Sequence, residues 1–341
     1  MQVGARFLAP VAAVARPSPA AAADGVTRHL VLGLRPGWQD PRDYEAIAEH
    51  VHELEPSIRV FIVRTTERNS TTRRMLARLP TFLFSPGRMS AFRLLRGKVY
   101  QGWPLEKFEE VRRLKLARVP VPRTAILTPQ LRLDPAEWGP FVILKPTDIA
   151  TSSHGRGINL MRTERVSYRP PGDYPPDHPG RLGPMIVQQY INTGDKLTTY
   201  RVLTLFGEPL YARLNIGGPR HFDLNAPDEA IESANVALQA ADARESPLID
   251  DPDILALARQ AHDALPEIPL KGCDILRDVD TGGLYVIELN SGGNTWHFSS
   301  NFGRTLRKVY GPEYELLMRQ QFDAMRTAAK VLIRRTLAEA E

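Results

Sequence analysis

The feature that most constrains this chain is a pair of apolar, strand-like runs within residues 271–290, separated by Asp-Thr-Gly-Gly at 280–283. Two such runs around a glycine-containing turn predict a β-hairpin. A turn at this position places Asp274 directly opposite Glu288, with Asn290 on the same face two residues further along. Directly opposed side chains in a sheet have Cβ atoms about 4.5–5.5 Å apart. The hairpin therefore brings two carboxylates and an amide together on one face of an antiparallel sheet.

Two like charges this close destabilise a sheet, so something has to offset them. Either one of the two carboxyl groups is protonated, or a cation lies between them. Carboxylates and an asparagine oxygen form an all-oxygen site, which suits Mg²⁺ or Mn²⁺. Magnesium takes few protein ligands and completes its shell with water and phosphate oxygens. A metal site at Asp274, Glu288 and Asn290 is one interpretation, and a solvent-facing hairpin with scattered acids is the other.

Length, cysteine count and charge limit the classes of protein that remain. The 341 residues are enough for two or three domains with a sizeable core. Cys273 is the single cysteine, which excludes an internal disulfide and a cysteine-based zinc site. The sequence has no run of 18 apolar residues, so we expect no membrane-spanning helix and a cytoplasmic protein. Residues 59–118 hold 15 Lys/Arg against 4 Asp/Glu, which indicates either an anionic partner or a solvated basic surface.

The first part of the chain has the pattern of a small α/β domain that follows a tail. Residues 1–26 are rich in Ala and Pro and keep no helical or strand period, which predicts a disordered tail; a secretory signal is the alternative. Residues 27–103 alternate strand-like runs with helical spacing, which predicts a parallel sheet. The expected strands are 29–34, 59–63 and 81–84, and the expected first helix is 44–54.

The remainder divides into two expected α+β units, 104–185 and 186–341. Pro104 is expected to open a helix, and the proline-rich stretch 170–184 to form a surface loop. The expected strands are 125–127, 141–145, 158–161, 186–191, 200–206, 209–214, 271–277 and 283–290, and the expected helices are 228–243, 252–264 and a long one from about 305 nearly to the end.

A lysine and a glycine-containing loop suggest where an anion could bind. Lys145 ends the apolar run 141–144, and a lysine at the end of a buried strand can reach a phosphate as a point charge. The segment 151–157 reads Thr-Ser-Ser-His-Gly-Arg-Gly, which allows a loop whose backbone amides face an anion. It lacks the Gly-Lys-Ser/Thr ending of a P-loop. An ordinary turn is the alternative for this segment.

Taken in order, these motifs resemble the ATP-grasp superfamily over about residues 104–303. The branch they resemble contains glutathione synthetase and the ribosomal-protein glutamate ligases. The resemblance implies two α+β subdomains that hold ATP between them, preceded by a small Rossmann-like pre-ATP-grasp domain. The segments that carry it are Glu106-Lys107 before 119–124, 142–146 with the loop to Gly157, 187–191, 200–203, and Gly272-Cys273-Asp274 with Glu288-Leu289-Asn290.

The resemblance also implies a role for particular residues. Arg201 and Arg213 would stabilise the transferred phosphoryl group, Asp195 would bind the ribose, and Gln189 departs from the glutamate that is common at its position. Lys107 and Lys145 would contact the nucleotide together with the loop residues Ser152, Ser153, Gly155 and Gly157 and the adenine hinge Gln188, Gln189, Tyr190 and Ile191, and Asp274, Glu288 and Asn290 would hold one or two Mg²⁺ ions.

The activity implied by the resemblance is an ATP- and Mg²⁺-dependent carboxylate–amine ligase. Such an enzyme forms an amide through an acyl phosphate and releases ADP and phosphate. Its partners would be ATP, a small-molecule or peptide carboxylate and an amine, with a homo-oligomer left open and no membrane partner expected. Two alternatives remain: an ATP-grasp-type kinase, and a catalytically silent module that binds nucleotide or nucleic acid through the basic block. Nucleic acid is disfavoured because the sequence has no RNA- or DNA-reading motif. For Trp296, His297, Tyr100 and Trp103, substrate contact and simple packing both stay open.

Overall fold

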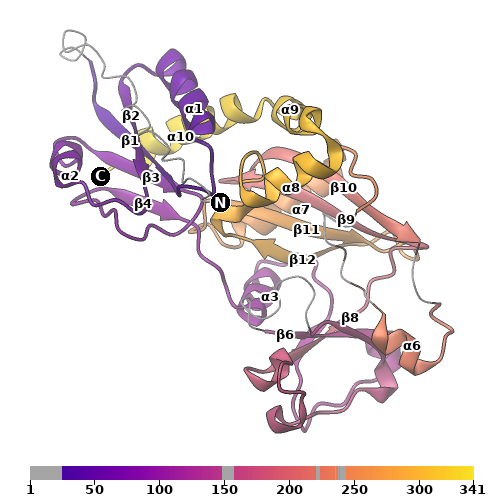
Figure 1. Ribbon diagram of the computed structural model, residues 1–341. Coiled ribbons are helices and arrows are strands. Elements are labelled where there is room, and N and C mark those ends of the chain that lie inside the picture. The colour runs from indigo at the N-terminus through magenta and orange to yellow at the C-terminus, as the bar shows by residue number, and fades with distance from the viewer. Residues whose placement is uncertain (1–24, 148–156, 220–222, 235, 237, 239–242) are drawn as a thin grey trace, which may run out of the picture.

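The computed structural model describes residues 25–147, 157–219, 223–234, 236, 238 and 243–341. Within these residues the strands form three four-stranded sheets (Figure 1). One sheet is parallel and two are antiparallel, which confirms the expected mixed α/β and α+β fold class. None of the described helices is long and apolar enough to cross a membrane.

The first sheet has the strand order β2-β1-β3-β4 and is parallel throughout. The predicted strands and first helix are present, and β4 is an addition that the sequence did not indicate. Asp40 caps the first helix by accepting from the backbone NH of Arg42, and Pro41 occupies the first turn. The elements are β1 (Arg28–Leu34), α1 (Pro41–Leu54), β2 (Ile58–Arg64), α2 (Ser70–Leu76), β3 (Thr81–Ser85) and β4 (Lys98–Gln101).

The second sheet has the order β5-β8-β6-β7 and is antiparallel. The helix before it begins at Lys107 rather than at Pro104, because Glu106 supplies the N-cap by accepting from the backbone NH of Glu109 at 2.9 Å. The stretch 170–184 holds only short 3₁₀ turns, as expected of a loop. The elements are α3 (Lys107–Leu116), β5 (Thr124–Ile126), α4 (Pro135–Trp138), β6 (Phe141–Pro146), β7 (Asn159–Arg162) and β8 (Met185–Gln189).

The third sheet has the order β10-β9-β11-β12 and contains both predicted hairpins. One face packs on the helix α7 (Pro252–Asp263) through a buried apolar cluster that includes Cys273 and Ile275. In Figure 1 this sheet lies above the second sheet, with α3 between the two. Its strands are β9 (Lys196–Leu205), β10 (Glu208–Pro219), β11 (Leu270–Arg277) and β12 (Leu284–Asn290).

Two helix predictions are wrong in length. The helix expected over 228–243 is α6 (Asp228–Ser233), because the backbone at Ala234 is extended. The long C-terminal helix is three helices, because Gly311 has φ +87° ahead of a proline and Asp323 adopts a left-handed conformation. These helices are α8 (Asn301–Tyr310), α9 (Pro312–Gln321) and α10 (Ala324–Glu339). The last of them packs against α1 and β10, and so joins the first sheet to the third.

Candidate active site

Four charged residues form one row across the third sheet. Arg213 of β10 pairs with Arg201 of β9, which pairs with Asp274 of β11, which pairs with Glu288 of β12. Side chains of directly paired residues project from the same face of a sheet, so all four lie on one face. The predicted opposition of Asp274 and Glu288 is confirmed. The two arginines that precede them in the row come from a separate hairpin.

Side-chain cations offset the two carboxylates of this row. The Arg201 Nε atom lies 2.7 Å from Oδ1 of Asp274, and Nζ of Lys107 lies 3.2 Å from Oε1 of Glu288. The Asn290 side chain donates from Nδ2 to Oδ2 of Asp274 at 3.0 Å. Sequence alone could not place Lys107 and Arg201 beside the hairpin, so protonation of one carboxyl group and a bound cation were the two expected solutions.

The two carboxyl groups titrate differently. Burial raises the pKa of Asp274 to about 6, although Arg201 acts in the opposite direction. Burial acts on Glu288 as well, but the charges of Lys107 and Lys145 outweigh it and lower the pKa of this carboxyl. Glu288 is therefore the carboxylate that stays charged over the wider range of pH.

Gly272 makes room for Arg201 within the sheet. A Cβ atom at Gly272 would collide with the Arg201 guanidinium, which lies over the strand at this point. Arg201 donates from Nη1 to the carbonyl oxygen of Gly272 at 3.3 Å. The missing side chain thus allows the arginine to lie flat beside Asp274.

The opposite wall presents Lys145 from the end of β6. Its ammonium group donates to Oε1 of Gln188 at 2.9 Å, and Nε2 of Gln188 donates to Oγ1 of Thr124 at 3.0 Å. Burial, followed by the neighbouring charge of Lys107, lowers the pKa of Lys145 to about 8. Thr124 ends the motif segment 119–124, but its contact with Gln188 depends on the pairing of β5 with β8, which could not be predicted from sequence.

Glu110 is a second residue that the sequence argument missed. It lies one helical turn after Lys107 on α3 and is 4% exposed. Its Oε1 accepts from the backbone NH of Leu289 at 2.8 Å, which fixes α3 against β12. Burial and the nearby charge of Glu288 raise the pKa of Glu110 to about 8. The spacing of three residues from Lys107 is the one signal that could have indicated it.

These groups surround a cleft of about 430 Å³. One part of its lining is apolar and comes from both antiparallel sheets, as with Ile143 of β6 and Leu276 of β11. The other part is charged. Ten of the residues singled out from the sequence line it: Lys107, Lys145, Gln188, Gln189, Tyr190, Ile191, Arg201, Asp274, Glu288 and Asn290.

The remaining predicted residues are not among those that line the cleft in the described part of the chain. Asp195 is exposed at the start of the β9 hairpin and is not part of the cleft lining, which holds Thr193 and Thr198 instead. Gly157 has φ +70° and precedes Ile158, which lines the cleft. Ser152, Ser153 and Gly155 lie outside the described residues.

Arg213 is completely buried at the β10 end of the charged row. None of its three guanidinium nitrogens has a hydrogen-bond partner among the described residues. Burying a charge without a partner costs roughly several kcal/mol, which is the desolvation penalty of one ion. An anion bound beside Arg201 and Arg213 would remove this cost.

The structure gives different surroundings to the four residues whose roles were open: Tyr100, Trp103, Trp296 and His297. Trp296 is fully buried and donates from Nε1 to Oδ2 of Asp43 on α1 at 2.6 Å, so it packs between parts of the chain. Tyr100 packs on aromatic rings of the first sheet, and Trp103 packs against the apolar cluster beside α7. His297 is the one of the four that lines the cleft.

Comparison with known proteins gives structural likenesses only. Neither a family model nor a curated sequence matches the chain. The chain is similar to the crystal structure of D-cycloserine synthetase DcsG, with 16% identity and a TM-score of 0.44 over 85% of this chain and 99% of that one. It is similar to the ATP-grasp ligase PsnB complexed with minimal precursor, with 17% identity and a TM-score of 0.49 over 91% and 100%. It is also similar to D-alanine–D-alanine ligase from Bacillus anthracis, with 13% identity and a TM-score of 0.42 over 91% and 99%.

Proposed function

We propose that the chain is an ATP- and Mg²⁺-dependent carboxylate–amine ligase of the ATP-grasp type. The observation that carries the proposal is that Arg201, Asp274 and Glu288 line one cleft with Lys107 and Lys145, while the buried Arg213 is the next residue of the same row. Two lysines and two arginines supply positive charge for a triphosphate and a transferred phosphoryl group. Phosphoryl transfer asks a protein mainly for positioning and charge neutralisation, which these residues can provide.

The nucleotide would lie with its base in the apolar part of the cleft. The segment 188–191 would form the adenine hinge, while Lys145 and Lys107 would bind the phosphates. Lys145 suits this role because Gln188 already holds its ammonium group in place. The loop residues Ser152, Ser153, Gly155 and Gly157 would close over the phosphates, and Asp195 remains the proposed ribose contact.

The donor set at the hairpin fits a metal ion that arrives with a nucleotide. Among the described residues no group of three His, Cys, Asp or Glu side chains could hold a metal on its own. Asp274 and Glu288 supply carboxylate oxygens, and Asn290 keeps its Oδ1 for a ligand because it donates through Nδ2. Mg²⁺ bound by one or two carboxylates and substrate phosphates matches this set. Bound there, the ion would neutralise developing charge on the phosphates.

The reaction would proceed in two steps. An oxygen of the substrate carboxylate attacks the γ-phosphorus, the bond to the β-phosphate oxygen breaks, and ADP leaves. The amine then attacks the carbonyl carbon of the acyl phosphate, the carbon–oxygen bond breaks, and phosphate leaves with the electron pair. Arg201 and Arg213 would stabilise the negative charge in both steps, since they lie side by side on β9 and β10.

The test is ADP release by the purified protein with ATP and Mg²⁺ against amino acids, small peptides and dicarboxylates. Hydroxylamine in the same reactions should trap the acyl phosphate as a hydroxamate. Lys145→Ala and Glu288→Ala should each lower turnover at least about 100-fold, because each removes charge from the transferring group. The exposed Lys330→Ala and Glu313→Ala are matched controls and should stay active. A stable phosphoester without hydroxamate would show a kinase, and no nucleotide turnover at all would contradict both.

A further inference from the structure

His297 occupies a defined position in the cleft wall. The residue is 5% exposed, lines the cleft and follows the buried Trp296. Its ring stacks on Tyr211 with centroids 5.9 Å apart and packs against Phe302 with centroids 4.6 Å apart. Its Nδ1 atom lies 2.5 Å from the hydroxyl oxygen of Tyr211. The hydrogen bond uses the Nδ1 edge of the ring, which leaves the Nε2 edge for the cleft.

The position of Tyr211 places His297 at the arginine end of the charged row. Tyr211 lies two residues before Arg213 on β10, and alternation along a strand puts both side chains on the cleft face. β10 and β12 are opposite edges of the sheet, so His297 lies away from Glu288 and its lysine. Lys107 and Glu288 thus lie toward the β12 end of the row, whereas His297 lies toward the end with the two arginines proposed to bind the transferred phosphoryl group.

We infer that His297 binds the incoming amine through Nε2 and accepts its proton as the amide bond forms. This inference rests on the ligase activity proposed above. In the step, the amine nitrogen forms a bond to the acyl carbon and the bond from that carbon to the phosphate oxygen breaks. Phosphate leaves with the electron pair, and the proton lost by nitrogen moves to Nε2. The role requires the tautomer in which Nδ1–H donates to the Tyr211 oxygen and Nε2 carries the lone pair, and the contact between Nδ1 and the Tyr211 oxygen allows this tautomer.

The surroundings of His297 keep the ring neutral before substrate binds. Burial lowers the pKa of the imidazole well below its usual value, and the charges of Arg213 and Arg201 lower it further. Tyr211, the other titratable group against the ring, stays protonated because burial raises its pKa to about 12. An acyl phosphate bound at the two arginines would offset their charge. The basicity of His297 would then rise when the step that needs a base begins.

A second buried histidine serves as the comparison for this assignment. His262 lies on α7, on the opposite face of the same sheet, and its Nδ1 is 2.8 Å from Oγ1 of Thr204. It is 2% exposed and forms no part of the cleft lining. Burial lowers the pKa of His262 well below its usual value too, so the two residues differ in access to the cleft rather than in neutrality.

The experiment compares two nucleophiles with one carboxylate found in the ADP-release screen. Hydroxylamine is already a neutral nucleophile at pH 7 and can lose its proton to solvent after attack, whereas an alkyl amine is mostly protonated there and has to lose a proton before it can attack. His297→Gln should lower amide formation about 100-fold, the usual scale of general-base catalysis, and should leave hydroxamate formation within about threefold of the native rate. His297→Ala should regain part of the amide rate with added imidazole. His262→Gln should lower neither rate selectively, and thermal melts check that each variant folds.

Each outcome decides between the claims. Equal loss of hydroxamate and amide in His297→Gln would show a structural role, and no loss of either would show that His297 lies outside the reaction; both overturn the inference. If His297→Gln does not fold, imidazole rescue of His297→Ala and the effect of Tyr211→Phe on the amide step alone decide it. Native protein that forms no hydroxamate with any carboxylate would overturn the ligase proposal itself.

Discussion

At the residue scale, β11 carries charged groups on both faces of the third sheet. Asp274 faces the cleft, whereas Lys271, three residues earlier, faces α7 and is fully buried. Its ammonium donates to the carbonyl oxygen of His262 in the last turn of α7 at 2.8 Å. A cation at the carboxyl end of a helix is favourable, but its burial is costly. Lys271 therefore couples the packing of α7 to protonation.

The first prediction is that Lys271→Met removes part of the pH dependence of stability. Burial lowers the pKa of Lys271 to about 7, with Glu267 and Asp263 acting in the opposite direction and Arg113 in the same one. Between about pH 7 and pH 10 the unfolded chain holds this proton and the folded chain does not, so stability rises with pH. The free energy of unfolding of the native protein should rise relative to Lys271→Met by about 1 kcal/mol per pH unit in that window.

Urea unfolding of both proteins at pH 7, 8 and 9 measures the difference. Other groups that titrate in this window, such as Lys145 and Glu110, are present in both proteins and cancel. Parallel stability curves for the native protein and the variant would show that Lys271 remains charged in the fold.

What could be predicted from sequence at this scale depends on how local the cause is. Alternation along a strand and a glycine turn were enough to place Asp274 opposite Glu288. Thr124 and Glu110 could not be found in this way, because each acts through a contact with a strand more than 60 residues away in sequence. The sequence shows which residues can share a strand pair, whereas packing between elements decides which charges they meet.

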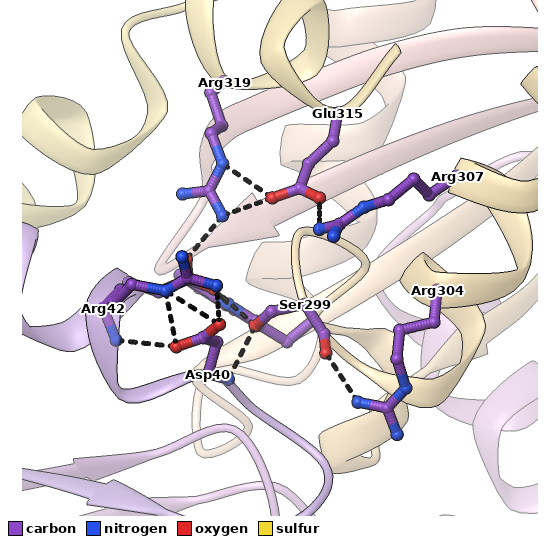
Figure 2. Close-up of polar contacts among 9 residues, drawn as sticks. Asp40, Arg42, Ser299, Arg304, Arg307, Glu315 and Arg319 are labelled. Atoms are coloured by element: carbon purple, nitrogen blue, oxygen red, sulfur yellow. Dashed lines mark hydrogen bonds and ion pairs between the residues drawn. The ribbon is translucent and has the colours of Figure 1, made fainter. Parts of the chain in front are cut away.

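At the scale of elements, α1, which packs beside the first sheet, holds the loop that carries His297. Asp43 is 1% exposed and accepts from Trp296, from the Ser299 hydroxyl at 2.5 Å and from Arg319 at 2.5 Å. Figure 2 shows Arg319 beside Glu315, and Arg42 folded onto Asp40 nearby. A second cavity is lined by Asp40, Arg42, Asp43, Arg307, Glu315 and Arg319. Because these arginines and acids pair with one another, the cluster is a structural contact between α1 and α9.

The second prediction is that Asp43→Asn weakens the contact of α1 with Trp296, Ser299 and Arg319. The substitution removes the charge from three short hydrogen bonds, and hydrogen bonds to charged groups contribute about 1.5–3 kcal/mol each. We expect a loss of about 2–3 kcal/mol in the free energy of unfolding, limited because Arg319 keeps Glu315 as a partner. Amide formation should fall more than ATP binding, because the loop that carries His297 loses its anchor.

A matched control lies on the same helix. Glu53 of α1 pairs with Arg326 of α10 at 3.1 Å on the surface, so Glu53→Gln should change stability by less than about 0.5 kcal/mol. Chemical unfolding and the two-nucleophile assay measure both variants. Equal effects of Asp43→Asn and Glu53→Gln would contradict a special role for Asp43.

The C-terminal helices show where element prediction failed although the signal was present. Gly311 followed by a proline marks a helix end, and apolar periodicity continued across it into the next helix. The left-handed turn at Asp323 had no such mark, because neither a glycine nor a proline stands at this position. Periodicity therefore showed that helices occur but not how many there are.

At the scale of the whole molecule, the cleft combines walls that are far apart in sequence. The second sheet supplies Lys145, and the third supplies the carboxylates. Helix α3 contacts the third sheet twice: Lys107 pairs with Glu288, and Glu110 accepts from the backbone NH of Leu289. In this contact, Lys107 is also a proposed phosphate ligand and Glu288 a proposed metal ligand. Binding at the cleft thus acts on the contact that holds α3 against the third sheet.

The last prediction is that Mg²⁺ and a non-hydrolysable ATP analogue stabilise the protein together more than separately. Two carboxylates and an amide are too few for a stand-alone magnesium site, whereas phosphate oxygens complete the shell. At a ligand concentration of 100 times Kd, binding adds about 2.7 kcal/mol to the free energy of unfolding, and Tm rises by about 2–4 °C per kcal/mol. Thermal melts with metal, nucleotide, both, and both plus EDTA should show a rise with both that EDTA reduces. Glu288→Gln should lose the metal-dependent part, while the exposed Glu313→Gln should keep it. A full rise in Tm with Mg²⁺ alone would mean that the carboxylates of the row Arg213, Arg201, Asp274 and Glu288 hold the metal without phosphate. The proposed joint binding of metal and nucleotide at this row would then be wrong.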